Sequence, residues 1–352
     1  MAFTDIFQAF LPKVAMPATM KQIAEHLGLS LPTVSQVLNN RGQLRPETRK
    51  RVLKAAEKLG YRPNTAAKAI STGRFNCIAL LLGADPLSGY LNRDMIEGIH
   101  DALAERNMHL NITKLPDQKL TDDGYVPKML RESMADGMLI NYKANIPPRM
   151  VELIEEDRLP AIWMYSKRPS DCVFNDNISG ARQATEHLIN LGHKRIAYID
   201  YSYGQRRRVD PEYAVKDRHE SYLATMNEAG LEPIEILGCR DSDWLAASTR
   251  WLQAPNRPTA VITYFINKAW PVLLAAKSLG LSVPGDLSIL SFSAQLPFDI
   301  GLPVTSMVFS GDELGRIAVE MVLEKIANPG KPVESRCTHF TLQPGATVGP
   351  PG

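Results

Sequence analysis

The chain lacks the signatures of several common protein classes. Its 352 residues include only four cysteines, which lie far apart and form no Cys-x-x-Cys pair. This spacing argues against a zinc site or a redox motif and suits a reducing, cytoplasmic compartment. No apolar run reaches the ~18 residues of a membrane span. The N-terminus has no basic region and carries Asp5 and Gln8 inside its apolar part, which is unlike a signal peptide.

Catalytic and nucleotide-binding motifs are absent as well. The chain contains no Gly-x-Ser-x-Gly, no His-Glu-x-x-His, no phosphate-binding Gly-x-x-x-x-Gly-Lys and no Gly-x-Gly-x-x-Gly after a strand. None of the seven histidines has a partner at metal-ligand spacing. We therefore predict no catalytic residue, no metal and no cofactor, and we expect that the protein is not an enzyme.

The charge is unevenly distributed along the chain. Residues 20–74 hold 11 Lys and Arg against 3 Asp and Glu, a net charge of +8. The net charge of the whole chain is only +2, and the charges of Asp5 and Lys13 in residues 1–19 cancel. Residues 75–352 therefore carry a net charge of −6. A basic head on an acidic body is typical of a nucleic-acid binder. A solvated helical domain rich in lysine is the alternative.

Residues 18–62 have the pattern of a small domain of three helices. The pattern predicts helices over about 20–27, about 31–38 and from Pro46 to the stop at Gly60. We expect Val52, Leu53, Ala56 and Leu59 on the inner face of the third. The second helix has an uncharged outer face, formed by Leu31, Pro32, Thr33, Ser35 and Gln36.

Two segments flank this head. Residues 63–74 form a linker in which Pro63 is followed by a short alanine-rich stretch. A helix this short is unstable alone in water, so it is expected to fold only against something else. Residues 1–17 form an N-terminal extension whose apolar residues follow helical spacing. A docking helix is one interpretation; we favour a tail that is disordered or that precedes a start at Met16.

Residues 75–352 alternate apolar runs with amphipathic segments. CIALLLG, GMLINY, PAIWMY, RIAYID, AVITYF and LSILSF read as buried parallel strands. About ten such strands exceed one compact sheet, so we predict two α/β lobes. A cleft at the carboxyl ends of the strands is the expected ligand site. We assign about 75–174 plus 306–334 to the N-lobe, and about 175–305 plus 335–348 to the C-lobe.

Motifs in the head closely resemble the lac repressor family of bacterial transcription regulators. Residues 19–39 contain the core S-x-x-T-V-S-x-V-L-N, and residues 59–64 read LGYRPN. The body is also similar over DGMLI, NDNISGARQATEHLINLGHKRIAYI, LGLSVPGDLS and DELGRIA. The resemblance covers about residues 18–350. It implies a multi-domain fold: an all-α helix-turn-helix head and an α/β two-lobed core like that of periplasmic binding proteins.

The resemblance also implies which residues contact DNA. The second helix would enter the major groove, where Leu31, Pro32 and Gln36 would read bases. An exposed surface or packing within the head is the alternative for these outer-face positions. Family phosphate contacts fall on Thr19, Thr33, Ser35 and Asn39, and the implied DNA-binding set also includes Ser30, Asn64, Lys68 and Ile70.

In the family, residues 63–73 correspond to a hinge helix that forms only on operator DNA. It pairs with its dimer mate and inserts an apolar side chain, here Ile70, into the minor groove. The head departs from the family at three positions. Gln36 stands where Arg is usual, Gln22 where Asp is usual, and Arg45 where a Ser or Thr cap is common, so Arg45 is expected to face phosphate.

The predicted effector site departs further from the family. Arg218 keeps the family arginine, but Ser293 and Ala294 follow Phe292 where Asp-Asp is common, and Phe265 and Ile266 stand where Asn-Asp is common. We therefore expect poor binding of simple sugars and a larger or more apolar ligand, with a glycan fragment as a hypothesis. For Trp163, core packing is an equal alternative. The effector-binding set is Arg218, Trp163, Phe265, Ser293 and Tyr90.

Together these observations predict a cytoplasmic, sequence-specific DNA-binding transcriptional regulator, a repressor controlled by a small-molecule effector, with carbohydrate as one class. The predicted partners are double-stranded operator DNA, the effector and a second copy of the chain, with no membrane. Nothing after Phe340 resembles a heptad repeat, which favours a homodimer over a tetramer. The effector could release the protein from DNA or promote binding. Two other classes are disfavoured: a solute-binding protein of the same core fold, and an enzyme in the two-lobed fold.

Overall fold

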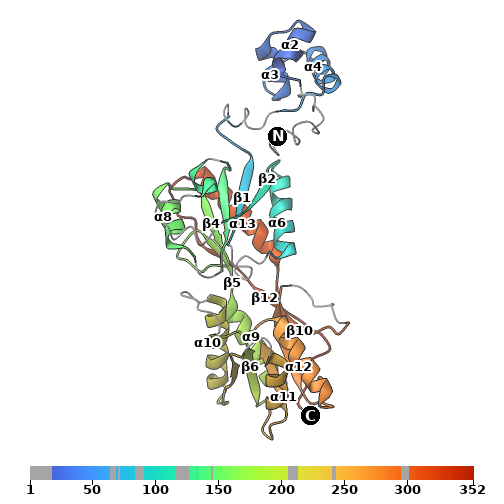
Figure 1. Ribbon diagram of the computed structural model, residues 1–352, viewed down its shortest axis with the longest axis vertical. Coiled ribbons are helices and arrows are strands. Elements are labelled where there is room, and N and C mark those ends of the chain that lie inside the picture. The colour runs from blue at the N-terminus through green and yellow to red at the C-terminus, as the bar shows by residue number, and fades with distance from the viewer. Residues whose placement is uncertain are drawn as a thin grey trace, which may run out of the picture. The chain divides into compact units, whose positions relative to one another are not determined.

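The computed structural model divides the chain into two compact units, residues 1–75 and 76–352 (Figure 1). Each unit is described by itself. The structure describes residues 18–63, 69, 72–83, 91–115, 127–132, 134–143, 146–204, 213–239, 243–294 and 301–352.

The first unit contains three helices, α2 (Met20–Leu27), α3 (Leu31–Leu38) and α4 (Pro46–Lys58), which pack together around one small core. The predicted helix ranges are confirmed. Buried Ile23, Val34 and Val52 bring one residue from each helix into this core. The predicted place of Leu53 is wrong, because its side chain is 49% exposed. Positions 52, 55, 56 and 59 follow the i, i+3, i+4, i+7 stripe of a core-facing helix, and position 53 lies outside it.

The second unit is built from two lobes, each with a six-stranded sheet. The first sheet has the strand order β11-β5-β4-β3-β1-β2, and all of its paired strands are parallel. Its strands are β1 (Cys77–Leu82), β2 (His109–Lys114), β3 (Gly137–Asn141), β4 (Ala161–Met164), β5 (Cys172–Asn175) and β11 (Arg336–Thr338). Its helices are α6 (Arg93–Ala104), α7 (Lys128–Arg131), α8 (Pro148–Glu156) and α13 (Gly311–Ala327).

The second sheet has the order β12-β10-β9-β8-β6-β7, in which only the β10–β12 pair is antiparallel. Its strands are β6 (Ile196–Asp200), β7 (Ile234–Leu237), β8 (Ala260–Thr263), β9 (Ser288–Ser293), β10 (Thr305–Phe309) and β12 (Phe340–Gln343). Its helices are α9 (Asn177–Asn190), α10 (Tyr213–Glu228), α11 (Trp244–Leu252) and α12 (Ile266–Ser278).

The chain crosses between the lobes three times, directly after β5, β10 and β11. Two of these crossovers differ from the predicted lobe boundaries. Strand β10 belongs to the second sheet and β11 to the first, so the crossings fall near residues 310 and 339 and not at 305 and 334. The apolar pattern of a buried strand is the same in either sheet, so only strand pairing could assign these two.

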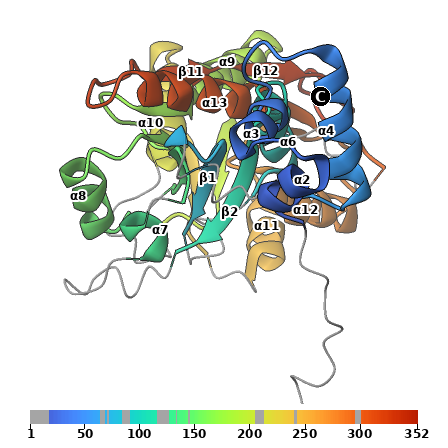
Figure 2. The same ribbon diagram turned by 90° about the horizontal axis from the view of Figure 1, so that it is seen from above.

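Both sheets are covered on two faces by helices. In the first lobe, α13 lies on one side of β1, whereas α7 and α8 lie on the other (Figure 2). In the second lobe, one face carries residues of α9 and α10, and the other packs against α11 and α12. This layering confirms the predicted α/β core. In the described part of the chain, no helix is both long and apolar enough to cross a membrane.

Candidate functional site

The first turn of α2 is closed by a reciprocal pair of hydrogen bonds. The Gln22 backbone N donates to Thr19 Oγ1 at 3.3 Å, and the Thr19 backbone N donates to Gln22 Oε1 at 2.8 Å. This capping box satisfies backbone donors that the helix itself cannot. Gln22, which departs from the family, is thus an effective structural partner of Thr19. The spacing T-x-x-Q could have revealed this role from the sequence.

A tight turn joins α2 to α3. Gly28 ends α2 in the left-handed conformation (φ 62°), which a residue without Cβ adopts at little cost. Ser30 then caps α3: its Oγ accepts from the Thr33 backbone N at 3.3 Å and lies 2.8 Å from Thr33 Oγ1. These caps explain why two such short helices begin and end where they do.

The outer face of α3 exposes the residues predicted to read bases. Val34 and Val37 turn into the core, whereas Leu31 (48% exposed), Pro32 and Gln36 face solvent. Leu31 and Pro32 occupy the first helical turn, where the missing N–H of proline costs nothing. The fold of the head therefore keeps all three side chains on its surface.

The carboxyl end of α3 links two predicted phosphate contacts to each other. Asn39 Nδ2 donates to the Ser35 backbone O at 3.0 Å and to Ser35 Oγ at 3.2 Å. The bond to the carbonyl satisfies an acceptor at the helix end. Both side chains remain half-buried, so their polar atoms lie at the edge of the exposed face.

Most cations of the head are not neutralised by nearby acids. Within residues 18–63, a single ion pair joins Lys21 to Glu25 at 4.0 Å. Arg45 stands at the N-cap of α4 and makes no capping bond there. These exposed charges leave the head with a positive surface. Four residues of the predicted sites, Asn64, Lys68, Ile70 and Tyr90, lie outside the described residues.

Arg218 is the cation of the predicted effector site, and it is buried. It lies on α10 with 4% exposure. Its Nε donates to Asn177 Oδ1 at 2.7 Å, and its Nη1 donates to the Tyr264 backbone O at 2.6 Å. The guanidinium carbon lies 4.1 Å from the centre of the Phe292 ring and 5.3 Å from that of Phe340. Sequence reasoning missed Asn177 and Phe340, because only the fold brings these distant segments together.

Two other predicted residues lie at the carboxyl ends of neighbouring strands of the same lobe, Ser293 as the last residue of β9 and Phe265 two residues beyond β8. Thr263 of β8 stands opposite Ser291 of β9, so Phe265 and Ser293 each follow two residues beyond this pair. Phe265 is half-buried at the start of α12, and Ser293 is buried. They therefore lie on the edge of the sheet that also carries Phe292 and its contact with Arg218.

The structure places Trp163 in an apolar core of the first lobe, as in the alternative of core packing. Trp163 is 4% exposed and packs in the apolar core that includes Met150 and Leu153 of α8. The Arg168 guanidinium covers its ring at 4.5 Å. The alternation of side chains along β4 directs it to this face of the sheet.

Buried Tyr198 extends the site around Arg218. Burial raises the pKa of its hydroxyl well above the usual value, and the Arg218 charge acts in the opposite direction. The Tyr198 ring stacks on Tyr222 with centroids 5.4 Å apart. Its hydroxyl has no hydrogen-bond partner among the described residues.

The two lobes also contact each other beside this site. Lys167, after β4, pairs with Asp217 of α10 at 3.1 Å. The Asn175 backbone N donates to the Tyr213 hydroxyl at 3.0 Å, and the Tyr213 ring meets the Phe174 ring edge-on. These contacts join strand ends of the first lobe to α10 of the second.

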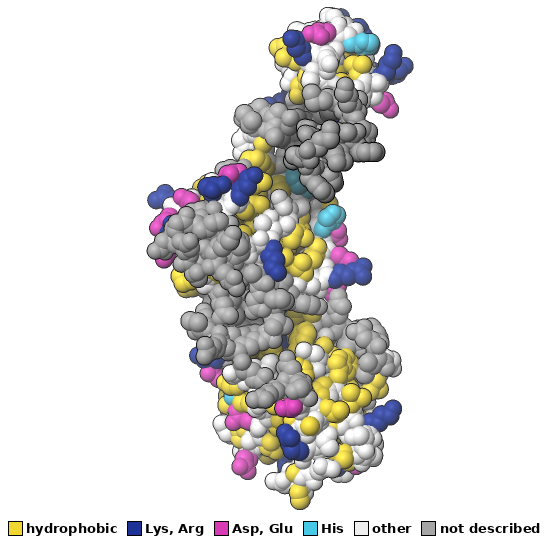
Figure 3. All heavy atoms as spheres, viewed as in Figure 1, with side chains coloured by type: hydrophobic (Ala, Val, Ile, Leu, Met, Phe, Trp, Pro, Cys, Tyr) yellow, Lys and Arg dark blue, Asp and Glu magenta, His cyan; other side chains and the backbone are white. Residues whose placement is uncertain are grey.

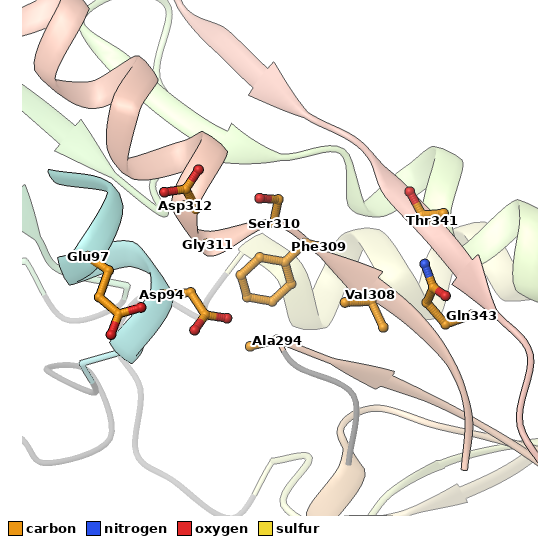
Figure 4. A pocket seen from close by; sticks show the side chains of 10 residues that line it. All are labelled: Asp94, Glu97, Ala294, Val308, Phe309, Ser310, Gly311, Asp312, Thr341 and Gln343. Atoms are coloured by element: carbon orange, nitrogen blue, oxygen red, sulfur yellow. The ribbon is translucent and has the colours of Figure 1, made fainter. Parts of the chain in front are cut away.

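A cavity of about 690 Å³ lies near the crossovers (Figure 4). Phe309 and Ala294 form part of an apolar wall, whereas Thr341 and Gln343 contribute polar groups. Two of the three acids that line it, Glu97 and Asp312, pair with Arg93 and Arg316. Arg218, Trp163, Phe265 and Ser293 are not among the described residues that line this cavity. Among the described residues, no group of three His, Cys, Asp or Glu side chains is arranged to hold a metal ion.

Comparison with known proteins identifies both parts of the chain. Residues 19–64 match the family described as bacterial regulatory proteins, lacI family, and residues 185–348 match a periplasmic binding protein-like domain. The chain is 27% identical to the HTH-type transcriptional regulator AglR of Rhizobium meliloti (strain 1021), over 95% of each chain. It is 26% identical to GalS of Salmonella typhimurium, over 92% of this chain and 94% of that one.

The same fold occurs in solved structures. A lac repressor dimer bound to operator and the anti-inducer ONPF has a TM-score of 0.78 at 18% identity, covering 95% of this chain and 99% of that chain. The relatives are transcription regulators, and the predicted resemblance is confirmed. The chain therefore combines a head that matches the lacI family of bacterial regulatory proteins with a core that matches a periplasmic binding protein-like domain.

Proposed function

We propose that the protein is a transcriptional repressor that binds operator DNA through its head and changes its operator affinity when a small molecule binds between the core lobes. The observation that carries this proposal is the outer face of α3. Leu31, Pro32 and Gln36 are exposed there, on a helix whose opposite face is buried. An uncharged, exposed face on a basic head suits base contacts accompanied by phosphate contacts.

The chemistry of this face favours A·T base pairs. A glutamine amide can pair with N6 and N7 of adenine. Leu31 and Pro32 have no side-chain donor, so they can contact only apolar groups such as the thymine methyl. Thr19, Ser30, Thr33, Ser35 and Asn39 would hold the head on the phosphates, with Arg45 beside them.

The linker would complete operator binding. Residues 63–73 would fold as a paired hinge helix on DNA, with Asn64 and Lys68 as contacts and Ile70 inserted between base pairs. Pyrimidine–purine steps kink most easily, so we expect one at the operator centre. An effector that alters lobe closure would change the spacing of two such hinges in a homodimer and thereby the affinity for the operator.

The test of this function is selection of binding sites from random DNA by the full-length protein. We expect an inverted repeat with A·T-rich half-sites, bound with an affinity that falls steeply as salt increases. Leu31→Ala should weaken binding to the selected site several-fold. The matched control is Leu53→Ala, since Leu53 is a leucine of the same head with nearly equal exposure, but on α4. Equal effects of the two variants, or no enriched sequence, would refute the proposal.

A further inference from the structure

The buried Arg218 guanidinium has only neutral partners among the described residues. It donates to an amide oxygen of Asn177 and a backbone oxygen of Tyr264, and it is flanked by aromatic rings. Its remaining nitrogen, Nη2, donates to no described residue. No Asp or Glu of the described chain forms an ion pair with it. Within the described part of the chain, the charge on this side chain therefore has no ion-pair partner.

Three described acids lie close to this site in the sequence, and each has a hydrogen-bond or ion-pair partner other than Arg218. Asp176 directly precedes Asn177, Asp200 is the last residue of β6, and Asp217 directly precedes Arg218 on α10. Asp176 caps α9 by accepting from Ser179, Asp200 accepts from Ser202, and Asp217 pairs with Lys167.

A buried cation of this kind is unfavourable without an anionic partner. Removing a guanidinium from water carries a large desolvation cost, which ring contacts and neutral hydrogen bonds offset only in part. An oxyanion would restore the balance, because arginine binds carboxylate and phosphate groups through parallel N–H···O bonds. A neutral hydroxyl can accept a hydrogen bond from the guanidinium, but it carries no charge to balance it.

Arg218 contacts residues that lie next to the chain segments joining the two lobes, so a ligand bound there can influence how the lobes are placed. Its partner Asn177 follows the crossover after β5, and Phe340 follows the crossover after β11. Because only three chain segments join the lobes, the lobes can part to admit a ligand. Binding at Arg218 would then act directly on two of these three segments.

We propose that the effector of this protein is an anion whose carboxylate or phosphate group binds the Arg218 guanidinium, with less polar parts against Phe292 and Tyr264. This inference rests on the proposed function, since it names the chemical class of the effector. It predicts that neutral sugars are poor effectors and that their acidic or phosphorylated derivatives are better ones.

The experiment measures the melting temperature of the full-length protein at constant ionic strength, with chloride as the reference anion. The probes are matched sets: glucose, glucuronate and glucose 6-phosphate; maltose and maltobionate; and acetate and inorganic phosphate alone. We expect an anionic probe at ten times its dissociation constant to raise the melting temperature by about 2–4 °C. The carboxylate and phosphate members of the sets distinguish the two sources of charge.

Variants then assign the effect to one side chain. Arg218→Gln should weaken binding of the anionic probe at least about tenfold, and Arg218→Lys, which keeps the charge, should weaken it less. Arg250→Gln, an exposed arginine on α11 of the same lobe, is the matched control and should not change it. If Arg218→Gln does not fold, Arg218→Lys and the wild-type probe series still decide the question.

Three outcomes would overturn the inference. These are equal stabilisation by a neutral sugar and its anionic derivative, stabilisation of Arg218→Gln as large as that of the wild type, and no stabilisation by any oxyanion beyond chloride. None of these would affect operator selection by the full-length protein. Failure of the proposed function would instead appear as a lack of sequence-specific DNA binding.

Discussion

Gln36 is the residue on which the base preference of the head depends most. It is exposed on α3, and a Cβ added to Gly42 would lie 3.1 Å from its Oε1, so the glycine leaves room for the amide. Gln36→Arg should move preference at one base pair from adenine towards guanine, by ~1–3 kcal/mol. Selection with both proteins measures this shift, and identical half-site logos would contradict it.

His193 makes the stability of the core depend on pH. Both ring nitrogens are in use: Nδ1 lies 2.9 Å from Thr259 Oγ1, and Nε2 lies 2.8 Å from the Gly349 carbonyl oxygen. Burial lowers the pKa of His193 below its usual 6.5, and a smaller, opposing effect comes from the bond to Gly349. The unfolded chain therefore binds a proton that the folded chain does not, so stability should decrease as pH falls below about 6.5.

Urea unfolding between pH 7.5 and 5 checks this dependence. The midpoint should fall with pH, and His193→Gln should reduce the slope. Burial also lowers the pKa of His187, so the variant should remove only part of the dependence. An unchanged slope in the variant would exclude His193 as a source.

At the scale of elements, the close packing of α6 on α13 holds the first lobe together. A Cβ on Gly98 would lie 2.3 Å from the Asp312 backbone oxygen, which is too close for any side chain. Gly98→Ala should therefore separate the helices and cost at least ~1–3 kcal/mol of unfolding free energy. Ala104→Ser, a comparable enlargement at an exposed position of α6, should stay within ~0.5 kcal/mol. Denaturant midpoints compare the two variants, and similar values would contradict the close contact.

At the scale of the whole molecule, we expect a homodimer. Leu274 on α12 and Leu245 on α11 are 58% and 48% exposed, and these helices pack side by side. Hydrophobic side chains also gather on the visible face of this lobe (Figure 3). Burying such residues between two copies would favour association.

Light scattering at micromolar concentration should thus report a dimer for the wild-type protein. Leu274→Asp should shift it towards monomer, because an uncompensated carboxylate would be buried. Leu53→Asp in the head should leave the dimer intact. A wild-type monomer or a stable tetramer would contradict this prediction.

The sequence alone was sufficient for features that depend on neighbouring residues. The ranges of α2 and α3 follow from Thr19, Gly28 and Ser30, whose caps act within one helical turn. The apolar runs predicted buried strands, because a strand covered on both faces needs no polar alternation. The exposed residues of α3 could also be predicted from the sequence, because helical spacing determines which side chains face outward.

Other features depended on contacts between distant segments, which the sequence does not encode locally. Trp163 looks equally suited to a core or a pocket, and only the pairing of β4 directs it into the core. The assignment of β10 and β11 to opposite sheets depended on strand pairing too. The sequence identified Arg218, but only the tertiary structure surrounded it with Asn177, Phe292 and Phe340 and paired it with no acid of the described chain. Local spacing therefore determined the helices and strands, whereas the environment of each buried side chain was decided by the fold that joins them.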